Sequence, residues 1–305
     1  MKFIDEFKEF INRGNVMDLA VGVIIGGAFT GIVTALTTNI INPLIAVFAG
    51  GGAGLVSKLV IPGTEIDFGA FISAVINFLI VAFVVFCLVK AINNSQIVMI
   101  PGGFSGGDEP DGSAKFITAF FRNPAVTEAV RDLLNNRDGL MLGICNGFQA
   151  LVKLGLVPYG DIVPMTPECA TLTFNNIGRH QSRLVRTRVA SNLSPWLSRC
   201  QVGDIHNVAI SHGEGRFVAS QELLAELKAK GQIATQYVDE AGVPSMDLSV
   251  NPNGALLAIE GITSPDGRVM GKMGHTERSA NGLYVNVPGE NFQPLIEGGV
   301  GYFTE

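Results

Sequence analysis

The stretch DGLMLGICNGFQALVKLG, residues 138–155, decides the fold of the larger part of this chain. It begins with an apolar run typical of a buried strand, turns sharply at Cys145, and continues with helical spacing. Gly143 and Gly147 complete the form G-x-nucleophile-x-G, in which flanking glycines avoid clashes on a strained strand-to-helix turn. The pattern predicts a nucleophile elbow at Cys145. A buried structural cysteine is the alternative, and the elbow alone does not decide between them.

The residues around this turn predict an activated thiol. The helix after Cys145 directs its N-terminal dipole toward the sulfur, which is expected to lower the thiol pKa and favour the reactive thiolate. The backbone N–H of Asn146, together with one from the Gly102-Gly103 loop, is expected to hold an oxyanion. These groups have the chemistry of an acyl-transfer site.

Strand-like and helical patterns alternate after residue 95, and this alternation predicts an α/β sheet domain. The expected strands are 97–100, 139–144, 184–189, 208–211, 233–238 and 256–259. The expected helices are 114–122, 125–135, the segment from Cys145 to about 154, and 220–230.

A base for the thiol is predicted in Gly274-His275-Thr276-Glu277. Residues two apart in an extended segment point the same way, so we expect His275 to face Cys145 and Glu277 to orient the imidazole. An H-x-E triplet alone is a weak motif, because any loop can contain one.

The remaining titratable residues do not predict a further site. Cys169 and Cys200 lack an elbow and are interpreted as structural, and His180 and His206 as ordinary histidines. The cysteines show no CxxC pairing and the histidines no cluster, so neither a metal site nor a disulfide framework is expected. The net charge of −6 and the pI near 5.3 argue against a nucleic-acid surface.

The first ninety residues have a different composition. No Asp, Glu, Lys or Arg occurs in 19–57 or in 68–89. A bilayer span needs roughly 20 apolar residues, so we predict membrane spans at about 16–43 and 69–90, after a short amphipathic helix at the membrane surface. A buried pair of soluble helices is the alternative. The basic residues favour a cytoplasmic location for both termini, because all but one lie outside the loop between the spans: Lys2, Lys8, Arg13, Lys90 and, in the loop, Lys58.

Small residues recur at steps of four along the first predicted span, at Gly22, Gly26, Thr30 and Thr34. Such a stripe lets helices approach closely. Two spans cannot enclose a pore, so a channel built from this segment has to be an oligomer.

Three segments resemble the large-conductance mechanosensitive channel: FKEFINRGNVMDLAVGVIIGGAF (7–29), NIINPLIAVFAGG (39–51) and FGAFISAVINFLIVAFVVFCLVKAIN (68–93). The resemblance covers residues 1 to about 93. It implies a tension-gated, non-selective homopentamer in the lipid bilayer of the inner cell membrane. By it, Leu19 and Val23 form the hydrophobic pore constriction, which gates by dewetting, and Gly22 and Gly26 let the pore helices pack and slide.

Four motifs resemble the glutaminase domain of phosphoribosylformylglycinamidine synthase, a class I glutamine amidotransferase: PGGFSGGD (101–108), GICNGFQ (143–149), SHGEGRF (211–217) and MGHTER (273–278). The resemblance spans about 95–305. It implies that Cys145 attacks the amide of glutamine, His275 shuttles the proton and Glu277 orients His275. Gln149 and the backbone near Ser211-His212-Gly213 are then expected to contact the glutamine.

The resemblance also implies partners. In the family, the ammonia travels to a synthetase portion that uses ATP and magnesium to make formylglycinamidine ribonucleotide for purine biosynthesis. That portion is missing here, so no cofactor is expected in this chain, and a separate synthetase subunit is an implied partner. The family has a strand, a helix and a further strand before the PGG strand. We therefore expect a doubly wound domain, 95–305, that lacks its first strand-helix elements.

The two resemblances meet at VKAINN–SQIVMIPGG without a recognisable linker. The charged linker and cytoplasmic helix that follow the channel are also missing, and two truncations at one point favour an accidental fusion. A domain with a radius of gyration of roughly 17 Å would also crowd its neighbours when hung directly from helices about 10 Å across. Three interpretations stay open: a channel with an inert passenger, a membrane-tethered glutaminase, and a chain with neither activity.

Overall fold

The computed structural model describes residues 68–103, 112–279 and 283–304. The first predicted span, 16–43, lies outside them, together with the predicted pore residues Leu19, Gly22, Val23 and Gly26. The chain divides into two units, Met1–Ala91 and Ile92–Glu305, and each is considered by itself.

The described part of the first unit belongs to helix α4, Phe68–Asn94. This helix coincides with the second predicted span, 69–90. Taken over the residues that the structure describes, no helix meets the combined length and apolarity that a bilayer crossing requires. The two-span architecture therefore stays a prediction.

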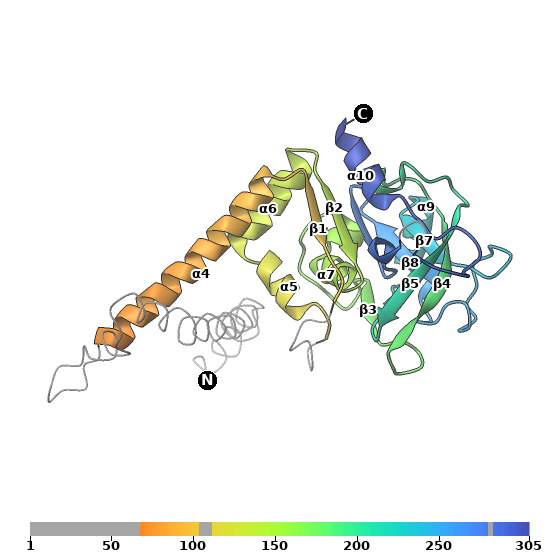
Figure 1. Ribbon diagram of the computed structural model, residues 1–305, viewed down its shortest axis with the longest axis horizontal. Helices are drawn as coiled ribbons and strands as arrows, with labels where there is room; N and C mark the ends of the chain where they lie inside the picture. The colour runs from red at the N-terminus through yellow and green to blue at the C-terminus, as the bar shows by residue number, and fades with distance from the viewer. Residues whose placement is uncertain (1–67, 104–111, 280–282, 305) are drawn as a thin grey trace, which may run out of the picture. The chain divides into compact units, whose positions relative to one another are not determined.

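The second unit is built on a seven-stranded sheet in the order β1-β2-β9-β8-β7-β4-β5 (Figure 1). The strands are β1 (Ile97–Ile100), β2 (Leu140–Ile144), β4 (Gln181–Val189), β5 (Ile205–His212), β7 (Ile233–Tyr237), β8 (Ile259–Thr263) and β9 (Val269–Lys272). β1, β2 and β9 are parallel to one another, whereas the remaining neighbours pair antiparallel. A separate antiparallel pair is formed by β3 (Thr171–Thr173) and β6 (Arg216–Val218).

Helices cover this sheet. The helices of this unit are α5 (Lys115–Phe121), α6 (Pro124–Asn135), α7 (Asn146–Leu154), α8 (Leu156–Tyr159), α9 (Gln221–Ala229) and α10 (Leu295–Thr304), of which α7 and α8 contact the sheet strands most extensively. Helix α7 packs against β1, β2 and β9, and all of its residues but Lys153 are buried. Helix α6 begins one residue before the predicted start at 125. Pro124 is its first residue, and the Asn123 side chain accepts a hydrogen bond from the N–H of Ala125.

The α/β class is confirmed, but the sheet is parallel only across β1, β2 and β9. The connection between β8 and β9 is a short turn, and short connections join antiparallel strands. The predicted strand at 256–259 is wrong. Leu256–Ala258 is a 3-10 turn, η3. The Asn251 side chain accepts the N–H of Ala255 and donates to its carbonyl, and these bonds hold the chain in a loop until β8 begins at Ile259.

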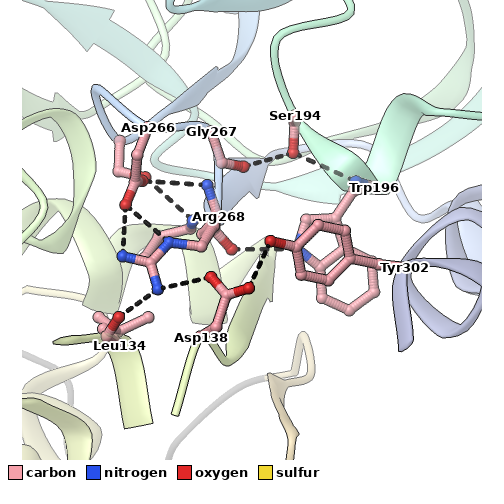
Figure 2. Close-up of polar contacts among 10 residues, drawn as sticks. Leu134, Asp138, Ser194, Trp196, Asp266, Gly267, Arg268 and Tyr302 are labelled. Atoms are coloured by element: carbon pink, nitrogen blue, oxygen red, sulfur yellow. Dashed lines mark hydrogen bonds and ion pairs between the residues drawn. The ribbon is translucent and has the colours of Figure 1, made fainter. Parts of the chain in front are cut away.

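A polar cluster ties the chain together at the end of the sheet where β2 and β9 begin (Figure 2). Arg268 donates to the carbonyl of Leu134 and forms ion pairs with Asp138 and Asp266. The hydroxyl of Tyr302, on α10, donates to the Asp138 carboxylate at 2.8 Å. The cluster therefore ties α10 to the residues that directly precede β2 and β9.

Candidate active site

Three parallel strands end side by side, and the predicted site residues follow them. Pro101, Gly102 and Gly103 follow β1, Cys145 follows β2, and His275 comes three residues after β9. The Cys145 N–H donates to the carbonyl of Lys272, the last residue of β9, at 2.8 Å. Ligand sites in α/β sheets form at such carboxyl ends.

Cys145 has the strained backbone of a nucleophile elbow, with φ 54° and ψ −106°. Non-glycine residues seldom adopt positive φ, and such strain clusters at functional sites. The neighbouring glycines are required by close packing. A Cβ on Gly147 would lie 2.0 Å from the carbonyl oxygen of Ile100, and one on Gly143 would lie 2.7 Å from that of Gly147.

The Cys145 thiol is buried among backbone groups. Its Sγ lies 3.8 Å from the carbonyl oxygen of Ser211 and receives the N–H groups of Asn146 and Gly103. Burial raises the pKa of the thiol to about 11, although these N–H groups and the Arg278 charge act in the opposite direction. The predicted lowering of this pKa is wrong, because loss of hydration at the sulfur outweighs the favourable N–H groups.

His275 and Glu277 form a close pair. His275 Nδ1 lies 2.6 Å from Glu277 Oε1, and the imidazole is buried. The prediction that His275 and Glu277 share an extended segment is wrong. The His275 N–H donates to the Ala209 carbonyl, and the next residues, Thr276–Arg278, form a 3-10 turn, η4. Within the described residues, His275 Nε2 has no hydrogen-bond partner.

The electrostatics of the pair favour an ionised Glu277. Burial opposes ionisation of this carboxylate, but the hydrogen bond with His275 and the charges of His275 and Arg278 outweigh it and lower the Glu277 pKa. A carboxylate that accepts from Nδ1 leaves Nε2 as the basic nitrogen.

Gly102 lies next to both His275 and Cys145. A Cβ on Gly102 would lie 2.6 Å from His275 Cε1 and 3.0 Å from Cys145 Cβ. The imidazole and the cysteine therefore both border one small space next to the β1 loop.

The other predicted contact residues surround this centre. Gln149 is buried on α7 and donates to the carbonyl of Glu214 at 2.5 Å. Ser211 Oγ lies 3.0 Å from His180 Nε2, so His180, which sequence reasoning set aside, borders the site. His212 is buried with Nε2 2.8 Å from Asn253 Oδ1, and burial lowers its pKa to about 4.

Two buried asparagines that sequence reasoning missed shape the loop after β5. Asn175 donates to the carbonyl of His212 at 2.9 Å and accepts from the N–H of Gly215 at 3.0 Å. Asn253 bonds to His212 and to the hydroxyl of Tyr237. Single asparagines in loops give no sequence signal, because their partners lie far away in the chain.

The arrangement combines a nucleophile, a base with an acidic partner, and two N–H donors at the sulfur, which is the equipment of acyl transfer. All four cysteines are free thiols. In the part of the chain that the structure describes, no group of His, Cys, Asp and Glu side chains has the arrangement of a metal site.

Comparison with known families gives two matches. The family model of the CobB/CobQ-like glutamine amidotransferase domain matches residues 71–302. The family model of the large-conductance mechanosensitive channel matches residues 3–135, so the two ranges overlap.

Individual relatives divide in the same way. The phosphoribosylformylglycinamidine synthase subunit PurQ of Synechococcus elongatus is 35% identical over 211 residues, which cover 68% of this chain and 82% of that protein. The large-conductance mechanosensitive channel of Leuconostoc citreum is 60% identical over 92 residues, which cover 30% of this chain and 73% of that protein. The solved structure of PurLQS from Thermotoga maritima has a similar fold, with a TM-score of 0.51 at 23% identity over 69% of this chain and 81% of that chain.

Proposed function

Since the chain belongs to the CobB/CobQ-like glutamine amidotransferase family over most of its length and to the large-conductance mechanosensitive channel family over its first part, we propose that it is a membrane-tethered glutaminase. The reaction is the hydrolysis of glutamine to glutamate and ammonia. The observation that carries the proposal is the His275–Glu277 pair, joined at 2.6 Å, beside the elbow of Cys145.

The first half-reaction forms a thioester. His275 Nε2 accepts the Cys145 thiol proton while Sγ bonds to the side-chain carbonyl carbon of glutamine. The N–H groups of Gly103 and Asn146 hold the resulting oxyanion. His275 then returns the proton to the amide nitrogen, the C–N bond breaks, and ammonia leaves. Because the free thiol has a pKa of about 11, its proton transfer accompanies the attack instead of preceding it.

The second half-reaction restores the enzyme. His275 takes a proton from water, the hydroxyl bonds to the thioester carbon, and the C–S bond breaks to give glutamate and the thiol. Gln149 and the backbone near Ser211 and His212 hold the glutamine. Glu277 keeps the imidazole in the tautomer that both steps need.

We infer that the ammonia is delivered to a separate synthetase subunit for formylglycinamidine ribonucleotide synthesis. The support is that the Synechococcus elongatus relative is named as a subunit of phosphoribosylformylglycinamidine synthase. ATP and magnesium belong to that subunit, and the glutaminase reaction of this chain needs no cofactor.

The test is glutamate release by purified membranes that carry the full chain. Cys145→Ala is expected to abolish release, because no other group supplies the nucleophile. Cys200→Ala is the matched control, since Cys200 is also buried and its pKa is also raised to about 11. Release that survives Cys145→Ala ends the assignment.

For residues 1–93 we propose a tension-gated, non-selective homopentamer in the inner membrane, with both termini cytoplasmic and with Leu19 and Val23 as the pore constriction. The support is the 60% identity to a mechanosensitive channel over 92 residues. Leu19→Asn is expected to lower the tension needed for opening in membrane patches, because a polar ring is easier to hydrate. Val56→Asn, in the predicted loop, is the control, and unchanged gating in Leu19→Asn contradicts the pore assignment.

The same two assays separate the alternatives. Conductance without glutamate release leaves a channel with an inert passenger, and neither activity leaves an inert fusion. Reading single DNA molecules across the codons for 89–103 tests whether the join itself is real.

A further inference from the structure

A buried charged pair lies beneath the loop that carries His275. Glu260 on β8 and Lys272 on β9 are both fully buried, and Lys272 Nζ lies 3.8 Å from Glu260 Oε1. Removing charges from water is costly unless they are paired and hydrogen-bonded. Neither residue takes part in the chemistry described above, so their place in the core needs another explanation.

Glu260 holds the residue before His275. Its Oε1 accepts the N–H of Gly274 at 2.6 Å, and its other oxygen accepts the hydroxyl of Thr235. A Cβ on Gly274 would lie 2.7 Å from Glu260 Oε1, so the loop rests directly on this carboxylate.

Lys272 holds the residue after His275. Its Nζ donates to Thr276 Oγ1 and to Gln293 Oε1, each at 2.6 Å. The Thr276 hydroxyl also donates to Gln293 Oε1, at 2.9 Å. The ammonium group therefore fixes Thr276 and, through Gln293, the segment that leads into α10.

We propose that Glu260 and Lys272 are positioning residues that hold the His275 imidazole against Cys145. Gly274, His275 and Thr276 are each tied to the core, by Glu260, by the Ala209 carbonyl and by Lys272 respectively. Three consecutive anchors leave the imidazole little freedom. This inference rests on the proposed glutaminase reaction, in which His275 serves as the base.

The first test is Glu260→Gln in the full chain in membranes. The substitution keeps the shape of the side chain but replaces the carboxylate by a neutral amide. With its N–H₂ in place of Oε1, the amide opposes both the Gly274 N–H and the Lys272 ammonium. With its N–H₂ toward Thr235, it leaves the Gly274 N–H a weaker, uncharged acceptor and removes the charge that pairs with Lys272. We expect kcat for glutamate release to fall about 10- to 100-fold with KM changed less than about twofold, because small misplacement of a base costs rate more than binding. An unchanged kcat overturns the proposal.

The second test does not depend on glutamine turnover. Iodoacetamide alkylation of Cys145, followed by peptide mass spectrometry, reports whether His275 still assists the thiol. We expect Glu260→Gln to slow labelling of Cys145 several-fold, which is only part of the roughly 10²- to 10⁴-fold that a positioned base contributes, because the imidazole is displaced and not removed. If the unsubstituted chain releases no glutamate but this slowing occurs, the proposed function fails while the positioning role stands. Unchanged labelling overturns the positioning role.

Three controls separate positioning from loosening of the fold. Cys200 is buried, so faster labelling of Cys200 in Glu260→Gln would indicate general opening and would contradict the proposal. The double variant Glu260→Gln/Lys272→Met removes the unpaired charge, and we expect stability to recover while kcat stays low. Recovery of kcat together with stability overturns the proposal. Glu226→Gln, which breaks the exposed Lys230–Glu226 pair at 2.6 Å, should change neither stability nor kcat.

Discussion

Gly102 lies so close to His275 that a methyl group on its Cα would come within 2.6 Å of the imidazole Cε1. The same methyl group would lie 3.0 Å from Cys145 Cβ. Neither neighbour can move away easily, because His275 is buried and bonded to Glu277, and Cys145 is held on the elbow. The glycine is therefore needed for the approach of base to nucleophile.

Gly102→Ala is expected to lower kcat for glutamate release about 100-fold, because displacement of the imidazole by about 1 Å is enough for such a loss. The measurement is steady-state release by membranes that carry the full chain. Gly203→Ala is the control, since a Cβ there meets nothing within 4 Å, and the strain of alanine at its positive φ lies before β5, at the other end of that strand from Ser211 and His212. Equal losses in the two variants would show that the effect does not come from the contact with His275.

The raised pKa of Cys145 predicts how the rate of iodoacetamide labelling of this thiol depends on pH. With a pKa of about 11, the thiol is protonated at neutral pH. Below the pKa, each added pH unit increases the thiolate fraction about tenfold. In His275→Asn, where no imidazole assists the thiol, iodoacetamide labelling of Cys145 should therefore climb steadily between about pH 7 and 9 without levelling off. Peptide mass spectrometry measures this rate separately for each cysteine.

Cys169 provides the internal comparison. Burial tends to raise its pKa, but hydrogen bonds from Thr166 and Tyr159 outweigh burial and lower it. Its labelling is therefore expected to level off at a lower pH than that of Cys145. A plateau for Cys145 below about pH 9 would instead support the activated thiolate that the helix after it predicts.

His212 predicts a loss of stability in acid. Burial lowers the His212 pKa to about 4, with further lowering from the charges of His275 and His180 and an opposing effect of the Asn253 hydrogen bond. Because an unfolded histidine titrates near 6.5, the unfolded state binds the proton first. Stability should fall by about 3 kcal/mol as the pH drops from about 6.5 to 4.

Trp196 makes this measurable in the full chain, because it is the sole tryptophan and lies buried in the second unit. Its fluorescence during urea unfolding at several pH values gives the free energy of unfolding. His206 is also buried with a lowered pKa, so the informative quantity is the difference between the unsubstituted chain and His212→Asn. Parallel pH dependences in the two proteins would contradict the role of His212.

The elbow was predictable because its information is local. The spacing of Gly143, Cys145 and Gly147 implies the turn, and the apolar runs on either side imply β2 and α7. Helix α6 was predicted over 125–135, and the Asn123 cap and Pro124 at its start are local signals of the same kind. The strands of three residues, β3 and β6, are too short for any periodicity to appear.

Properties that depend on tertiary contacts were not predictable. The Cys145 pKa follows from burial, which the local sequence does not specify. Glu260 meets Lys272 only because β8 and β9 pair in a register that sets Gly261 opposite Lys272. The contact of His275 with Glu277 was expected from an extended backbone, yet a 3-10 turn makes it.

The cluster around Arg268 predicts a loss of stability without a loss of catalysis. The Arg268 side chain is 18% exposed and holds Leu134, Asp138 and Asp266 (Figure 2). Arg268→Met removes these contacts and leaves the Leu134 carbonyl without this donor, so we expect unfolding to become easier by about 1–3 kcal/mol. The cluster lies at the end of the sheet opposite Cys145, so kcat and KM should change less than about twofold.

Lys230→Met is the matched control, because the Lys230–Glu226 pair joins side chains that are 52% and 51% exposed. Exposed pairs of this kind contribute about 0.3–0.5 kcal/mol, so this variant should unfold almost like the unsubstituted chain. Trp196 fluorescence in urea measures both variants, and glutamate release measures catalysis. If Arg268→Met and Lys230→Met lower the free energy of unfolding equally, the buried Arg268 contacts stabilise the fold no more than an exposed ion pair does. If Arg268→Met lowers kcat as strongly as Gly102→Ala, the two ends of β9 are coupled.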